Sequence, residues 1–118
     1  MIISISSHLS LHLNNNDRKL KLYFSEITME IMANSGEQNV ISPYYYKCPD
    51  EIYLDNIKIA EKNRSINLES QGNITIKLIW FTQLTTLRSI FYDFNNITYI
   101  DLSRFDASHV IDITEKFL

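Results

Sequence analysis

The residues best suited to nucleophilic or metal chemistry are one cysteine and three histidines. Cys48 would act as a nucleophile only if an imidazole activated its thiol, and the available partners are His8, His12 and His109. None of these spacings matches a catalytic motif, and the neighbouring Pro49 indicates a turn. His8 and His12 have the i,i+4 spacing of two metal ligands on a helix, but no third ligand lies nearby in the sequence. The sequence therefore predicts neither a thiol enzyme nor a metal site.

Paired carboxylates and glycine-rich loops are the other features that support catalysis. Asp101 and Asp106 are close in the sequence, but the apolar pattern around them predicts an outward-facing Asp101 and a capping role for Asp106. Gly36 and Gly72 are isolated from each other, so the chain has no glycine-rich phosphate loop. We therefore expect that the protein is not an enzyme and has no cofactor.

The composition indicates one globular domain without a strongly charged surface. The chain has 118 residues, of which 45% are hydrophobic and 21% are charged, with a net charge of -3. Nucleic-acid binding needs clustered Lys and Arg, so we expect no nucleic-acid partner. No run approaches the ~18–20 apolar residues of a membrane-spanning helix. A single cysteine excludes a disulfide within the chain.

Residues 1–18 are expected to form an N-terminal tail or a weak signal-like segment. The sequence MIISISSHLSLHL is apolar, but it lacks a basic region and a clear cleavage site. A packed strand or a short helix is the alternative. Three Asn-x-Ser/Thr sequons, at Asn63, Asn73 and Asn96, are compatible with secretion but do not by themselves indicate it.

Residues 19–82 have the pattern of a β-rich region. Apolar and polar residues alternate over residues 19–32, and the alternation is cleanest from Ile74 to Trp80. Turn signals follow these segments, and Asp55-Asn56 is a candidate hairpin turn. We therefore expect several strands with one buried face.

The last third of the chain combines two periods. Residues 84–94 have apolar residues at spacings of three and four, which predicts a short helix, and residues 97–105 are expected to form a strand. Helical spacing returns over residues 110–117. The interval of 26 residues from Phe91 to Phe117 falls within the ~20–29 of a leucine-rich repeat.

The segment NITYIDLSRFDASHVIDITEKF resembles the repeat of BspA-like leucine-rich surface proteins, and matches its I-x-x-I-D-L-S-x-F-D pattern. The upstream stretches SEITMEI, CPDEIYLDN and NITIKLIWFTQLTT resemble the β-rich region that precedes the repeats in protist members. The resemblance covers residues 25–118 and implies an α+β fold. In that fold a β-rich cap (residues 19–82) leads into a short leucine-rich-repeat solenoid of about one repeat (residues 83–118). The expected repeat core is Ile97, Ile100, Leu102, Phe105, Val110, Ile113 and Phe117.

The resemblance also implies a function. It predicts a non-catalytic protein-interaction module, at the cell surface or secreted, that mediates adhesion or binds an extracellular protein. The expected binding residues lie on the sheet face and are Tyr99, Asp101, Ser103, Thr75 and Lys77. The aromatic run at residues 44–46 is a second candidate contact site.

The small number of repeats suggests an alternative function. A single repeat leaves its apolar edge uncovered, whereas solenoids need neighbouring repeats or caps. The chain is then a truncated or degenerate family copy that acts as a structural cap or assembly module with longer repeat chains. Self-association through the C-terminal edge, around Val110 and Phe117, is expected in that case.

Overall fold

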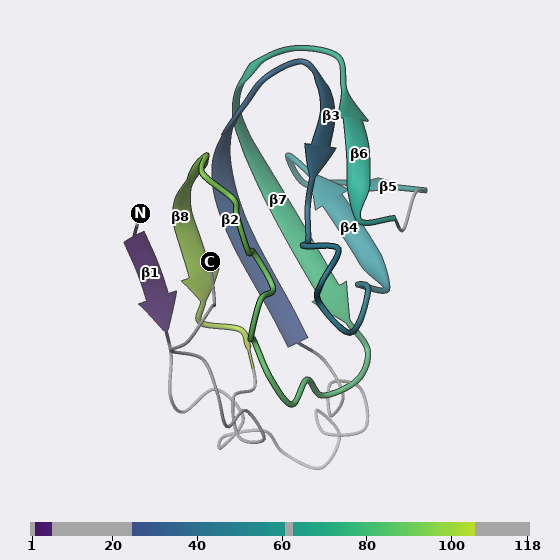
Figure 1. Ribbon diagram of the computed structural model, residues 1–118, viewed down its shortest axis with the longest axis vertical. Helices are drawn as coiled ribbons and strands as arrows, with labels where there is room; N and C mark the ends of the chain where they lie inside the picture. The colour runs from purple at the N-terminus through teal and green to yellow at the C-terminus, as the bar shows by residue number, and fades with distance from the viewer. Residues whose placement is uncertain (1, 6–24, 61–62, 106–118) are drawn as a thin grey trace.

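The computed structural model describes residues 2–5, 25–60 and 63–105, which contain eight β-strands and no helix (Figure 1). The strands are β1 (Ile2–Ile5), β2 (Ser25–Ala33), β3 (Gly36–Asn39), β4 (Glu51–Leu54), β5 (Ile57–Ile59), β6 (Ser65–Leu68), β7 (Gly72–Trp80) and β8 (Ile97–Leu102). The described part of the chain is therefore all-β.

Six strands form the main sheet, in the order β1-β8-β2-β7-β4-β5. Neighbouring strands run antiparallel, except that β1 and β8 at one edge run parallel. The central strands β2 and β7 have nine residues each. The strand predictions are confirmed for residues 25–32 and 74–80, while residues 19–24 lie outside the described residues. Asp55-Asn56 forms the turn of the β4–β5 hairpin.

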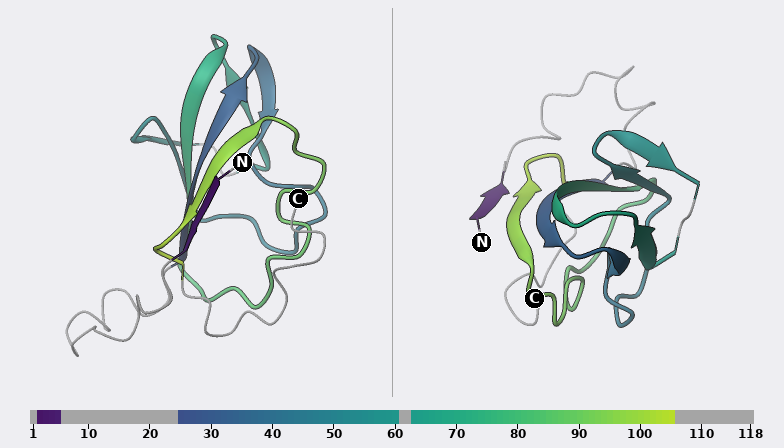
Figure 2. Two further views of the ribbon diagram at one scale, coloured as in Figure 1. Left: turned by 90° about the vertical axis from the view of Figure 1, so that its left-hand side faces the viewer. Right: turned by 90° about the horizontal axis from the view of Figure 1, so that it is seen from above.

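The smaller sheet, β3–β6, continues the β2–β7 pair beyond a bend. Ala33 lies opposite Gly72 in the first pair, and Gly36 lies opposite Leu68 in the second. Gly36 and Gly72 have φ angles of 104° and 137°, which residues with a Cβ atom rarely adopt. The chain turns over at this end of the sheet in both Figure 1 and Figure 2. The only two glycines of the sequence therefore occupy the bend.

Strand alternation buries one face of the main sheet. The buried side chains of this inner face include Ile27, Met29, Ile31, Ile52, Ile76, Leu78, Trp80 and Ile100. Side chains from β6 and from the turn-rich segments 40–50 and 81–96 complete the same core cluster. Trp80 donates a hydrogen bond from Nε1 to the Lys47 carbonyl at 3.2 Å. This bond satisfies a buried polar group and connects the sheet to one of the two segments.

The helix predicted for residues 84–94 is wrong, because this segment forms successive turns. Its backbone hydrogen bonds span three residues, from Ile90 N to Leu87 O, from Tyr92 N to Ser89 O and from Phe94 N to Phe91 O. Ser89 and Asp93 have φ angles of 64° and 65°, in the left-handed region that interrupts an α-helix. Turns of three residues bury the apolar stripe that the helix was expected to bury.

The α+β fold with a leucine-rich solenoid is also wrong. A solenoid strand contacts only neighbouring repeats. Here β8 instead lies between β1 and β2 in the main sheet and runs antiparallel to β2, with Asp101 opposite Thr28. Ile100, Leu102 and Phe105 are buried in the same core as the upstream strands. The expected contributions of Val110, Ile113 and Phe117 lie outside the described residues.

Candidate functional site

The binding residues predicted from the sequence share the outer face of the main sheet. Tyr99 and Asp101 alternate along β8 with buried Ile100, and Thr75 and Lys77 flank buried Ile76 on β7 in the same way. Ser103 follows directly after β8.

Strand β2 separates the two pairs. Its Glu30 lies opposite both Tyr99 and Thr75, and its Thr28 lies opposite both Asp101 and Lys77. The structure therefore brings the predicted residues to one face, with a strand that the prediction did not include between them. Alternation alone indicates the face, but the strand order cannot be deduced from it.

Several of these residues already have contacts within the chain. The Nζ atom of Lys77 lies 4.6 Å from the ring centroid of Tyr53 on β4, which is a cation–π geometry. The Asp101 carboxylate accepts a hydrogen bond from Ser103 N at 2.8 Å, which stabilises the turn after β8. These contacts give Lys77 and Asp101 structural roles on the outer face.

The same face carries two ion pairs. Lys58 Nζ lies 2.7 Å from Glu51 Oε2, and Arg104 Nε lies 3.8 Å from Glu26 Oε2. The hydrogen bond to Glu51 raises the pKa of Lys58. Charges of both signs are thus interspersed and paired, which is typical of a solvated sheet face.

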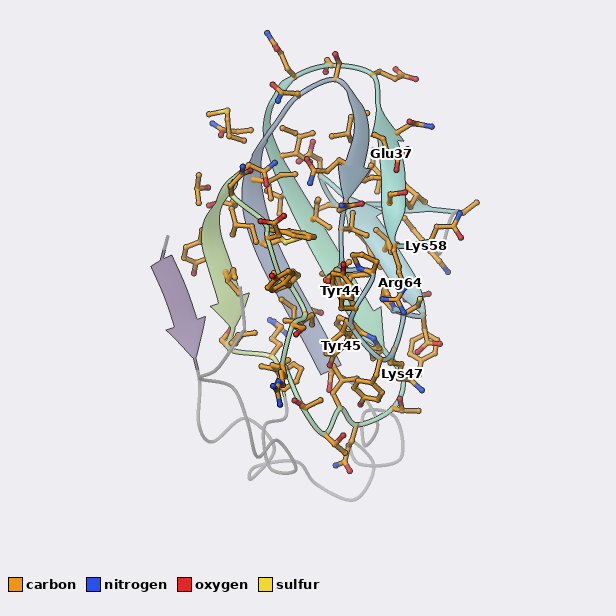
Figure 3. All side chains as sticks on the ribbon, in the orientation of Figure 1. Glu37, Tyr44, Tyr45, Lys47, Lys58 and Arg64 are labelled. Atoms are coloured by element: carbon orange, nitrogen blue, oxygen red, sulfur yellow. The ribbon has the colours of Figure 1, made fainter. Side chains whose placement is uncertain are left out.

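The aromatic run at residues 44–46 is divided by the structure. Tyr45 is only 2% exposed, whereas Tyr44 is 75% exposed and Tyr46 is 53% exposed. The Tyr45 ring packs edge-on against Trp80, with centroids 6.4 Å apart, and its hydroxyl donates a hydrogen bond to the Thr86 carbonyl. Tyr45 therefore anchors the segment that displays its two neighbours. Figure 3 labels Tyr44, Tyr45 and Lys47 along this segment.

A third exposed tyrosine comes from the segment that was expected to be helical. Tyr92 is 45% exposed, and its ring meets Tyr44 edge to face, with centroids 5.7 Å apart and an interplanar angle of 83°. Tyr44, Tyr46 and Tyr92 are called the tyrosine patch below. Tyr92 was not predicted, because only the packing of two turn-rich segments brings it to Tyr44.

Hydrogen bonds donated by backbone amides connect the two segments that carry the patch. Ser42 N donates to Ile90 O at 2.8 Å, and Thr85 N donates to the Tyr46 hydroxyl at 3.2 Å. Arg64 donates from its guanidinium to Ser42 O at 2.6 Å, and the Ser42 hydroxyl accepts from Tyr44 N at 3.0 Å. The backbone beneath the patch is therefore fixed on several sides.

Candidate catalytic groups are not brought together in the described part of the chain. Residues 2–5, 25–60 and 63–105 contain no group of three or more His, Cys, Asp and Glu that could hold a metal ion. Cys48 is exposed, while all three histidines and Asp106 lie outside the described residues. The expectation that the protein is not an enzyme stays a prediction.

Among the residues that the structure places, no helix is long and apolar enough to cross a membrane. Comparison with family models, curated proteins and solved structures finds no match to this chain. The resemblance to BspA-like proteins therefore stays an expectation that depends on the motifs quoted above.

Proposed function

We propose that the chain is a non-catalytic protein-binding module whose contact site is the tyrosine patch. The observation that carries the proposal is that Tyr44, Tyr46 and Tyr92 are 45% to 75% exposed above the buried anchor Tyr45. Tyrosine is enriched at binding hot spots because it offers a large amphipathic surface with only two side-chain torsions to fix. The hydrogen bonds beneath the patch lower the entropy cost of binding still further.

The resemblance to BspA-like surface proteins supports the choice of partner. It favours an extracellular or cell-surface protein, an adhesive role and a location at the cell surface or outside the cell. None of this requires a solenoid, because the patch lies in the all-β part of the chain. The outer face around Tyr99 and Thr75 is the competing contact site for the same function.

Selection of peptides from a library tests the patch directly. Random 12-residue peptides displayed on phage would be selected against the wild-type chain, and the enriched peptides would be synthesised and titrated by calorimetry. We expect the double variant Tyr44→Ser/Tyr92→Ser to weaken their binding about 10- to 30-fold, which is the loss typical of hot-spot residues. The matched variant Tyr99→Ser, on the outer face, should change the affinity by less than about twofold, in line with residues outside a hot spot.

Two results would contradict this assignment. Peptides that lose affinity for Tyr99→Ser and not for the double variant would place the contact site on the outer sheet face. A library that yields no more enrichment than it does against an unrelated β-sheet protein would count against a peptide-binding site altogether. Circular dichroism of each variant would show that it retains the β fold.

A further inference from the structure

The N-terminal strand β1 is attached to the sheet along one edge only. It pairs in parallel with β8, with Ile2 opposite Tyr99 and Ile5 opposite Leu102. The strand order gives β1 no second neighbour, and Figure 1 shows it at the side of the sheet beside β8. The β1–β8 pair is also the only parallel pair in the described sheets.

At the opposite edge of the sheet, a short hairpin turn connects the edge strand to its neighbour. There β5 follows β4 through the two-residue turn Asp55-Asn56, with φ angles of 47° and 70° that suit a type I′ hairpin. Asp55 N also donates a hydrogen bond to Thr75 O at 2.9 Å, which holds the turn against β7. A short turn of this kind keeps β5 beside β4 of its own chain.

The segment that connects β1 to β2 is much longer than the two-residue turn between β4 and β5. The 19 residues from 6 to 24 separate β1 from β2, and such a length of chain can span up to ~60 Å. Since β8 lies between β1 and β2, the two strands are only ~10 Å apart across the sheet, so the connection is far longer than the pairing within one chain requires. It is also long enough to reach the sheet of a second molecule.

We propose that β1 is an exchangeable strand, which pairs with β8 of a second copy of the chain to form a strand-swapped dimer. The hydrogen bonds between β1 and β8 are the same in both arrangements, so only chain entropy and concentration decide between them. A tethered strand has an effective concentration in the ~mM range, so the dimer should accumulate on refolding at about that concentration.

The sequence of β1 and the edge of β8 both favour β1 of a second molecule as the strand that pairs with β8. The strand sequence IISI is uncharged and rich in β-branched residues, and it has no Lys of the kind that blocks pairing at exposed edges. Without β1, the backbone groups of β8 on that side would have no strand partner. The dimer is independent of the tyrosine patch, which lies in other segments.

Disulfide capture between two chains tests the proposal. In a Cys48→Ser background, one chain would carry Ser4→Cys and the other Asp101→Cys, which are register partners. Parallel neighbours about 5 Å apart lie within the Cα distance range of a disulfide. After the two chains are refolded together at about 1 mM and oxidised, the mixed dimer should exceed the half share that random pairing gives. A chain with Thr28→Cys, on a strand that does not adjoin β1, is the mismatched control.

A single chain that carries both Ser4→Cys and Asp101→Cys distinguishes pairing of β1 within its own chain from pairing between two chains. If its internal disulfide forms while the mixed dimer stays at the level of the mismatched control, β1 remains in its own chain and the proposal is wrong. If the internal disulfide fails to form, the pair Ile2→Cys and Tyr99→Cys repeats the test at another register position. Failure of that pair as well would refute the β1–β8 pairing from which the dimer follows.

Discussion

Replacing Tyr45 with phenylalanine removes one hydroxyl from the core and leaves the ring in place. The ring is only 2% exposed and packs against Trp80, so the variant should keep the apolar contacts of the core. The change removes the hydrogen bond that the Thr86 carbonyl accepts from this hydroxyl. We expect the free energy of unfolding at pH 8 to fall by about 1–1.5 kcal/mol, the usual worth of such a bond.

The same variant should alter how stability depends on pH. Burial raises the pKa of the Tyr45 hydroxyl above its ordinary value, and the neighbouring Tyr46 raises it further. In the unfolded chain the pKa of a tyrosine is about 10. Above that pH the unfolded state loses a proton that the folded state retains, so the wild-type free energy of unfolding falls by up to ~1.4 kcal/mol per pH unit. The contribution is fully present below pH ~10 and declines as the pH rises.

The lost hydrogen bond and the lost titration act in opposite directions, so the free energies of unfolding of wild type and Tyr45→Phe should become equal at high pH. Tyr45→Phe lacks this titrating group, so the difference of about 1–1.5 kcal/mol at pH 8 should shrink to near zero close to pH ~11. Urea unfolding followed by the fluorescence of Trp80, the only tryptophan, measures both chains at each pH. Other titrating groups are shared by the two chains and cancel in the difference.

A control and a refuting result complete this experiment. Tyr44→Phe, at a ring that is 75% exposed, removes a tyrosine hydroxyl from the surface and should change stability at pH 8 by less than about 0.5 kcal/mol. A difference between wild type and Tyr45→Phe that stays constant from pH 8 to pH 11 would show that the hydroxyl is not shielded from water. Equal stability of the two chains at pH 8 would count against the hydrogen bond.

Three further changes test other parts of the fold by urea unfolding. Gly72→Ala meets no atom within 4 Å of the added Cβ, so its cost of about 1–3 kcal/mol should come from the positive φ alone; a neutral result would mean that the bend has another backbone conformation. Ile100→Ala should lower the free energy of unfolding by about 2–5 kcal/mol, because the side chain is fully buried. Ile57→Ala, at a side chain 70% exposed, should lower it by less than about 0.5 kcal/mol. Similar losses would contradict the placement of β8 in the core. Asn96→Asp removes the side-chain amide that donates to Met32 O and to Gln38 Oε1, and it should cost about 1–3 kcal/mol of stability. Asn95→Asp, at the exposed neighbour, should be close to neutral. Equal effects of the two changes would contradict the hydrogen bonds of Asn96.

Local patterns in the sequence predicted the central strands well. Ile27, Met29 and Ile31 alternate with polar residues, and the structure buries all three on one face of β2. The same holds for Ile76 and Leu78 on β7. A period of two is a property of neighbouring residues, so it can be recognised without knowledge of the partner strands.

The wrong predictions concern features that local patterns do not determine. Leu84, Leu87 and Ile90 fit a helix and a series of three-residue turns equally well, and the left-handed Ser89 decides for turns. The strand of the expected repeat was predicted, but its neighbours were not, because pairing with β2 and β1 depends on contacts between distant segments.

The candidate site shows the same limit. Alternation placed Tyr99 and Lys77 on an outward face, yet it could not show that β2 lies between their strands. The exposure of Tyr44 and its contact with Tyr92 come from the packing of two irregular segments, for which the sequence has no periodic signal. The sequence indicated the aromatic run as a candidate contact site, but it did not indicate that Tyr92 joins Tyr44 and Tyr46 in the tyrosine patch.

The pairing of the first strand with the last described strand also constrains synthesis on the ribosome. Ile3 cannot pair with Ile100, its register partner, until that residue has been translated, 97 residues later. At ~5–20 residues per second this interval lasts about 5–20 s, which is long compared with the folding time of many small domains. During that interval residues 2–5 lack β8, their partner in the described sheet, so another strand can pair with them first. The order of strands in the sheet thus delays one of its pairings until almost all of the described chain has been made.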